Sequence, residues 1–231
     1  MSAGQRWLSV AAVCAALAIG GAVGCSRTAT DSSGTEGQSQ AAEKPKTSAT
    51  GTAGALPTIA DYLKQNDITP TQVKPGDPNA PVVKLPILPN WRDAGAATPP
   101  YAYGAQVDTN PEFAEDPPTI VVTYSKLPSN ADSAEILKLA PNEIRNLPKF
   151  NAEFGGAEEP VQEKLAGFDS VRFGGSYVRD GIGRLIAQKT AVIPAKDGLY
   201  MLQINVNGRD DSVADLAEAG TAIDAFTTIT P

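Results

Sequence analysis

The chain has 231 residues, of which 42% are hydrophobic and 19% charged, with a formal net charge of −7 and no histidine. The missing imidazole excludes Ser-His-Asp and Cys-His nucleophiles, His-ligated zinc or haem, and a histidine switch near neutral pH. The acidic balance argues against a nucleic-acid partner, because such binding needs a basic surface that displaces counterions from phosphates. We therefore expect no cofactor, no metal and no nucleic acid.

The first 24 residues have the pattern of an export signal. Arg6 is their only charged side chain, and an apolar run and small residues then lead to Cys25. The run is shorter than the roughly 20 apolar residues of a membrane span. Ala22-Val23-Gly24-Cys25 resembles the lipobox of bacterial lipoproteins, in which the cysteine thiol is diacylated and the signal is cut just before that cysteine. We predict a signal peptide over residues 1–24 and lipid attachment at Cys25; an ordinary secretory signal with an incidental cysteine is the alternative.

Residues 25–55 then have the composition of a tether. From Ser26 to Ala55, 21 of 30 residues are Ser, Thr, Ala or Gly, and large apolar side chains are missing. Such a segment cannot bury enough apolar area to offset the entropy lost on ordering, so we expect a disordered linker. The pattern predicts a domain held outside the membrane by a lipid, on the periplasmic or extracellular face, with shedding of the domain as an alternative.

Residues 56–231 are predicted to form one folded domain. Thr58, with Asp61 three residues later, is a helix start, and that helix should end before Ile68-Thr69-Pro70. A Pro-rich stretch from 75 to 118 follows, with a short strand at 82–85. Residues 119–126 are rich in β-branched side chains and are the clearest strand.

The second half of the domain alternates one helix, a strand meander and another helix. Residues 132–146 predict a helix that Pro141 kinks or divides in two. Strands are expected at 168–179, 184–193 and 199–206, with Gly174-Gly175 marking a bulge or a close backbone approach. The closing helix at 210–226 should start at an N-cap Asp210 or Asp211 and turn Phe226 inward. These elements predict an α+β fold with a mainly antiparallel sheet flanked by helices.

The sequence lacks the motifs of common catalytic sites, and we predict no enzymatic activity. GxSxG, P-loop and GxGxxG patterns are missing, and the acid pairs Glu158-Glu159 and Asp210-Asp211 are adjacent, so their side chains point apart. An esterase or transferase that uses acidic groups is the remaining catalytic alternative.

Aromatic side chains are the better candidates for a binding site, although core packing is their ordinary role. Tyr101 and Tyr103 lie between Pro99-Pro100 and Gly104, which places them in a loop. A phenol with an apolar ring and a polar tip suits an amphipathic ligand with a sugar head and an acyl tail. The predicted ligand-binding residues are Trp91, Tyr101, Tyr103, Tyr124 and Tyr177.

Several short strings, taken in order along the domain, resemble the LpqN/LpqT family of mycobacterial lipoproteins. They are Thr58-Ile-Ala-Asp-Tyr62, Gly76-Asp-Pro78, Asp116-Pro-Pro-Thr-Ile120, Ser125-Lys-Leu127, Asn146-Leu-Pro-Lys-Phe150, Gly174-Gly-Ser-Tyr177, Ala187-Gln-Lys-Thr-Ala-Val-Ile-Pro194 and Thr227-Thr-Ile-Thr-Pro231. The resemblance implies a PsbP-like fold and a cell-envelope lipoprotein without catalysis. It also implies a link to the export of trehalose-mycolate lipids through large transporters.

Two functions from different classes follow. The first is a lipid-anchored accessory protein that binds an amphipathic glycolipid of the trehalose-mycolate type and assists an envelope lipid transporter. The second is a protein-interaction module whose target is a partner protein, including a host protein, with no lipid cargo. Binding of lipid by the purified domain distinguishes the two.

Overall fold

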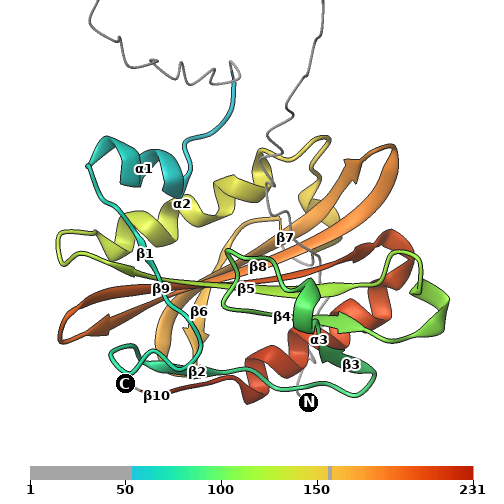
Figure 1. Ribbon diagram of the computed structural model, residues 1–231. Coiled ribbons are helices and arrows are strands. Elements are labelled where there is room, and N and C mark those ends of the chain that lie inside the picture. Colours follow the sequence, from blue (N-terminus) through green and yellow to red (C-terminus); the bar gives the residue numbers. More distant parts are fainter. Residues whose placement is uncertain (1–53, 156–157, 231) are drawn as a thin grey trace, which may run out of the picture. The chain divides into compact units, whose positions relative to one another are not determined.

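The computed structural model describes residues 54–155 and 158–230 (Figure 1). The signal peptide at 1–24, the lipid site at Cys25 and nearly all of the tether lie outside the described residues, so these assignments stay predictions. No helix among the described residues is long and apolar enough to cross a membrane.

An antiparallel sheet of eight strands is the centre of the structure. Its strands are β1 (Thr71–Gln72), β3 (Trp91–Asp93), β4 (Gly104–Asp108), β5 (Thr119–Leu127), β6 (Val161–Leu165), β7 (Phe168–Arg179), β8 (Ile182–Ala195) and β9 (Gly198–Arg209). The spatial order is β3-β4-β5-β9-β8-β7-β6, with β1 paired to β5. A separate antiparallel pair joins β2 (Val82–Lys84) to β10 (Thr228–Thr230). With three α-helices, this confirms the predicted α+β class with a mainly antiparallel sheet.

The helices cover both faces of the sheet. They are α1 (Ile59–Gln65), α2 (Ser133–Arg145) and α3 (Val213–Phe226). On β8, Gln188 donates to Glu143 of α2, whereas the next residue, Lys189, pairs with Asp224 of α3. Because successive strand side chains point to opposite faces, α2 and α3 lie on opposite sides, as Figure 1 shows.

Local sequence signals explain α1 and α2. Thr58 and Asp61 form the predicted capping box, and α1 ends at Gln65, before Ile68 as expected. Asp132 caps α2 through its side chain. α2 continues through Pro141 as one helix, so the prediction of two consecutive helices is wrong; packing of its apolar face against the sheet keeps the helix intact despite the missing donor.

The start and end of α3 differ from the prediction. A short 3-10 turn, Asp210–Ser212, precedes the helix, and Ser212 occupies the N-cap position without a side-chain cap bond. Asp211 pairs with Arg209 instead of capping. Phe226, predicted to face inward, is 68% exposed, whereas Ile223 of the same last turn is 3% exposed and faces the sheet.

The paired glycines of β7 allow close backbone approach, one of the two predicted reasons for their presence. A Cβ on Gly174 would lie 2.4 Å from the main-chain oxygen of Ile186 on β8. A Cβ on Gly175 would lie 2.4 Å from the main-chain oxygen of Asn151. Both contacts are with backbone, so a side chain at either position forces the strands apart.

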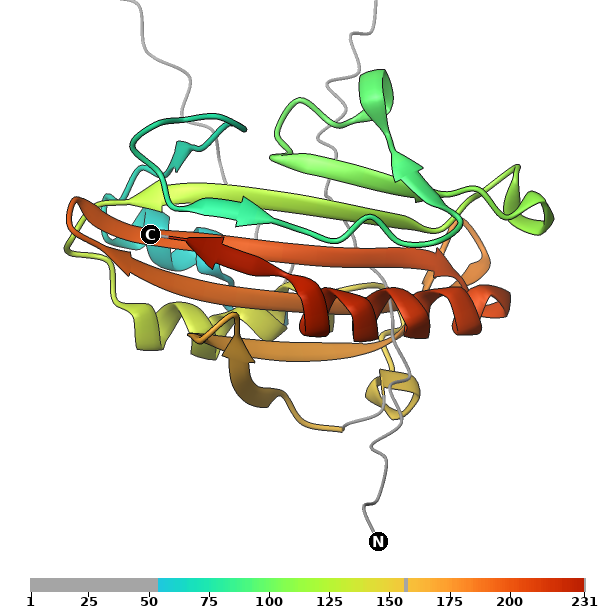
Figure 2. The same ribbon diagram turned by 90° about the horizontal axis from the view of Figure 1, so that it is seen from below.

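The core divides along the two faces of the sheet. On the α1 and α2 side, Leu199 and Met201 of β9 pack in a cluster with both helices. On the α3 side, Leu202 and Ile204 pack against α3, and Val83 of β2 joins the same cluster. Figure 2 shows this second side, where β10 runs beside β2 next to α3. The Pro-rich segment that contains β2 therefore covers the part of the sheet face that α3 leaves.

Candidate functional site

The five aromatic residues predicted to bind a ligand occupy different environments. Trp91, Tyr124 and Tyr177 are buried, Tyr103 is half-buried and Tyr101 is 41% exposed. The structure brings Tyr103 and Tyr124 together on the side of α3, whereas Tyr177 pairs across β7 and β8 with Arg184. Ligand binding by these residues stays a prediction, and their positions favour Tyr103 as the residue nearest a cavity.

A third tyrosine, Tyr200, completes a row that the sequence analysis did not identify as a site. The Tyr103 and Tyr124 rings meet edge to face with centroids 5.4 Å apart, and the Tyr124 and Tyr200 rings lie 5.6 Å apart. Tyr124 and Tyr200 come from the neighbouring strands β5 and β9, where Tyr124 is opposite Leu202. Regular alternation on these strands therefore places both rings on one face.

The hydroxyls of this row reach alternate carbonyls of one extended segment. Tyr200, Tyr124 and Tyr103 lie 3.0, 3.2 and 3.3 Å from the main-chain oxygens of Asn79, Pro81 and Val83, respectively. We call Tyr103, Tyr124 and Tyr200 the tyrosine ladder. Asn79 ends a turn and Val83 lies in β2, so the row of hydroxyls follows this segment from the turn into the strand.

Burial keeps the ladder protonated. Burial raises the pKa of Tyr103, Tyr124 and Tyr200 above the ordinary tyrosine value of 10.0. The nearby Tyr200 ring raises the pKa of Tyr124 further. A phenol whose pKa is raised stays a hydrogen-bond donor throughout the physiological pH range.

A polar cluster lies at the Tyr200 end of the ladder. Asp197 accepts a hydrogen bond of 2.5 Å from Lys126 and also lies 3.1 Å from the Tyr200 hydroxyl. The hydroxyl has one proton, which it can donate either to Asp197 or to Asn79. The hydrogen bond from Lys126 holds the pKa of Asp197 below its ordinary value. The Lys126 and Asp197 side chains at this end of the ladder are therefore charged and partly exposed to solvent. Tyr124, in the middle of the ladder, is buried.

Residues 78–89, the first part of which the ladder contacts, border three cavities. The largest, about 800 Å³, lies between residues 78–82 and residues 194–197 of the β8–β9 turn. One of 220 Å³ lies between Val83, Leu85 and Ile87 on one side and β4, β5 and Tyr103 on the other. The third, about 690 Å³, lies between residues 86–89 and α3.

The third cavity, which we call the cleft, is mainly apolar. It is lined by Pro86, Ile87, Leu88, Pro89, Ala217, Glu218, Thr221, Ala222 and Phe226. Ile87 is 73% exposed and Phe226 68% exposed, so two large apolar side chains stand at the cleft in solvent. Ile87 also lines the 220 Å³ cavity, which makes the two cavities neighbours. Ligand pockets of proteins have volumes of roughly 300–1,000 Å³ and mostly apolar walls, and the cleft has both properties.

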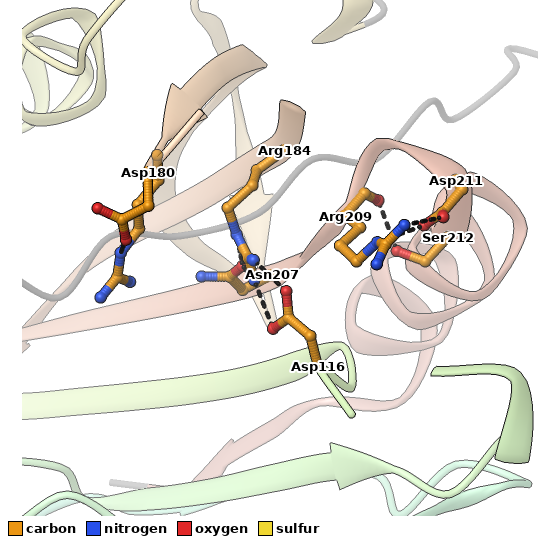
Figure 3. A network of polar contacts seen from close by, with 8 residues as sticks. Asp116, Asp180, Arg184, Asn207, Arg209, Asp211 and Ser212 are labelled. Atoms are coloured by element: carbon orange, nitrogen blue, oxygen red, sulfur yellow. Dashed lines mark hydrogen bonds and ion pairs between the residues drawn. The ribbon is translucent and has the colours of Figure 1, made fainter. Parts of the chain in front are cut away.

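A second polar network lies away from the ladder (Figure 3). The buried Arg184 guanidinium donates to both oxygens of Asp116, at 2.5 and 3.3 Å, and to Asn207 at 2.8 Å. The hydrogen bond to Asp116 and the charge on Asp116 raise the pKa of Arg184 against the effect of burial. The network therefore connects the loop before β5, which carries Asp116, to Arg184 of β8 and Asn207 of β9.

In the part of the chain that the structure describes, no group of three His, Cys, Asp or Glu side chains could hold a metal ion. The site that remains is a set of cavities around one extended segment.

Three comparisons relate the chain to known proteins. The model of the family described as "Probable lipoprotein LpqN" matches residues 56–230. Lipoprotein LpqN of Mycobacterium tuberculosis (strain ATCC 25618 / H37Rv) is 41% identical over 181 residues, which cover 78% of this chain and 76% of that protein. A crystal structure described as LpqN involved in cell envelope biogenesis of Mycobacterium tuberculosis superposes with a TM-score of 0.71. It is 41% identical, covers 77% of this chain and is matched over 100% of its own length, so a chain of that extent folds on its own.

Proposed function

The chain belongs to the LpqN family of lipoproteins, and from this premise we propose that it is a lipid-anchored protein of cell-envelope biogenesis that binds an amphipathic glycolipid. The lipid is of the trehalose-mycolate type, and the protein assists a transporter that exports it. The proposal is non-enzymatic: the protein holds the lipid and passes it on unchanged.

The observation that carries the proposal is the cleft. Its walls are apolar, Ile87 and Phe226 are exposed beside it, and a second apolar cavity adjoins it at Ile87. Large apolar side chains left in water cost free energy that an alkyl chain recovers by covering them. The crystallised relative is described as involved in cell envelope biogenesis, which supports the same cellular role here.

The proposed anchor agrees with this role. A diacylated Cys25, followed by the tether, would hold residues 56–231 near the outer face of the cell membrane, where envelope lipids emerge. A lipid-anchored protein stays at the membrane while its cleft remains free to accept a ligand.

Native mass spectrometry of residues 56–231 with an alkyl-trehalose tests the proposal. We expect a one-to-one complex, and replacing Ile87 and Phe226 by Ser should weaken it about tenfold or more, because each loses an apolar contact. Ile182→Ser is the matched control: Ile182 is 44% exposed at the start of β8 and does not line the cleft. A domain that binds no alkyl-trehalose, or binds it equally in all variants, contradicts the proposal.

The same exposed pair also suits a protein partner, the second candidate function. Cross-linking in cells separates the two functions: a partner that is retained by a domain unable to bind lipid favours an interaction module. Loss of lipid and partner together favours the delivery role.

A further inference from the structure

Among the described residues, the segment held by the tyrosine ladder makes few other hydrogen bonds to the main sheet, although Val83 and Leu88 pack in the core. Residues 78–89, which we call the flap, contain four prolines, at positions 78, 81, 86 and 89. Proline lacks the N–H that a strand needs, so the flap cannot merge with the main sheet as a ninth strand. It crosses the sheet face instead, and β2 within it pairs only with the three residues of β10.

The ladder supplies the hydrogen bonds that pairing would otherwise give. Tyr124 and Tyr103 reach Pro81 and Val83 at 3.2 and 3.3 Å, and Gln106 donates to Pro86 at 2.8 Å. For core packing alone, phenylalanine would fill these positions as well as tyrosine. The Tyr103 and Tyr124 hydroxyls, with Tyr200 sharing its proton between Asn79 and Asp197, therefore indicate that the ladder holds the flap against the sheet.

All three cavities have the flap as one wall. Residues 78–82 border one, residues 83–87 the second and residues 86–89 the third. Movement of the flap away from the sheet therefore joins separate cavities into one trough. The trough floor is apolar, because Val83 packs there against Ile120 and Val122 of β5.

We propose that an alkyl chain of the bound lipid occupies a site beneath the flap, continuous with the cleft, and that release of Pro81 and Val83 by the tyrosine ladder opens this site. The inference rests on the proposed function, and it adds where the alkyl chain lies and that the flap controls access to this site. The occupant is an alkyl chain and not a sugar, because it replaces the apolar contacts that Val83 and Leu88 give up.

The first test removes two ladder hydroxyls and keeps their rings. Tyr103→Phe combined with Tyr124→Phe should speed hydrogen–deuterium exchange of residues 80–85. It should also raise the association rate constant for dansyl-labelled undecanoic acid about tenfold, the equivalent of one net hydrogen bond. Energy transfer from Trp91, the single tryptophan of residues 56–231, reports binding by stopped flow. Tyr62→Phe is the matched control, since the Tyr62 hydroxyl bonds the main chain of Asp132 at the α1 side.

The second test fixes the flap. Lys84 and Thr228 are exposed and lie directly opposite each other in the β2–β10 pair, two residues after the end of α3. Opposite residues of antiparallel strands have Cα atoms about 4.5–5.5 Å apart, within disulfide range. Residues 56–231 contain no cysteine, so Lys84→Cys with Thr228→Cys gives a single disulfide. The oxidised protein should bind the probe at least tenfold more slowly than the reduced protein, which should match wild type.

The outcomes separate this inference from the proposed function. Probe binding at equal rates in the wild-type, phenylalanine and oxidised proteins overturns the flap site and leaves the cleft standing. Faster exchange at residues 80–85 with an unchanged association rate overturns it too, as does unchanged exchange. No binding of the probe by any form, wild type included, overturns the proposed function itself.

Discussion

The negative charge of the Glu143 carboxylate lowers the stability of the folded protein. Glu143 lies on α2 and accepts hydrogen bonds of 3.0 Å from the side-chain amides of Gln188 and Gln203. Burial raises the pKa of Glu143, and the two amide bonds offset that rise only in part. The folded protein therefore binds a proton here more tightly than the unfolded chain does.

This difference predicts how Glu143→Gln changes stability with pH. Since the folded-state pKa is raised above its ordinary value of 4.5, wild type should lose stability as the pH rises from 4.5 through the folded-state pKa. The variant removes that loss and should be more stable at neutral pH by on the order of 1 kcal/mol. Urea unfolding at a series of pH values measures the effect. Glu135→Gln is the control, because Glu135 lies on the same helix with its side chain 33% exposed and paired with Lys138 at the surface. Equal pH slopes for Glu143→Gln and wild type would contradict the prediction.

Two of the arginine–aspartate pairs in Figure 3, Arg184–Asp116 and Arg209–Asp211, differ in burial, which predicts that they stabilise the fold unequally. Arg184 is 11% exposed in its pair with Asp116, whereas the side chains of Arg209 and Asp211 are about half-exposed. Asp116→Ala leaves a buried guanidinium without its counter-charge and should lower the free energy of unfolding by about 2 kcal/mol. Asp211→Ala should cost less than about 0.5 kcal/mol, because exposed pairs contribute little. Equal urea midpoints for the two variants would show that the Arg184 network does not stabilise the fold.

At the scale of elements, close approach of the β8 backbone leaves no room for a side chain at Gly174 of β7. Gly174→Ala puts a methyl group 2.4 Å from the Ile186 oxygen, and separating β7 from β8 should lower the free energy of unfolding by about 2 kcal/mol or more. Gly104→Ala is the control, because no atom lies within 4 Å of its added Cβ and its φ is not positive. Thermal unfolding of both variants measures the contrast, and a neutral Gly174→Ala is the contrary result.

Elements with strong local signals were the ones that the sequence predicted well. The capping box of α1, the apolar face of α2 and the strands around the Asp180-Gly181 turn are encoded by neighbouring residues. β6 and β10 were not predicted. β6 is a short edge strand with one charged side chain on each face, Glu163 and Lys164. The three residues of β10 become a strand only by pairing with β2, more than 140 positions earlier.

At the scale of the whole molecule, the strand order and the candidate site both depend on contacts that sequence patterns do not reveal. β5 lies beside β9, although a helix and three strands separate them along the chain. The ladder forms only because that pairing places Tyr124 beside Tyr200, and its carbonyl partners lie more than 40 residues from Tyr124. Sequence reasoning could select Tyr103 and Tyr124 as aromatic candidates, but their common target, the flap, follows from the fold.

The net charge of the folded domain limits the ways in which the protein can bind a membrane. Residues 56–231 carry 15 basic and 23 acidic side chains, a net charge of −8. Anionic lipid headgroups attract basic segments and repel a domain of this charge. Electrostatic attraction therefore offers no route to the membrane, and we predict that acyl chains on Cys25 supply the binding.

Cys25→Ala should consequently move the full chain from the membrane fraction to the soluble fraction, since the variant has no thiol at position 25 to acylate. Cell fractionation followed by immunoblotting measures the distribution. Cys14→Ala is the matched control, because Cys14 lies inside the predicted signal peptide and is removed with it, so that variant should remain in the membrane. A wild-type chain that is already soluble would favour the ordinary secretory signal. A Cys25→Ala chain that stays in the membrane would require an attachment that the acidic domain does not explain.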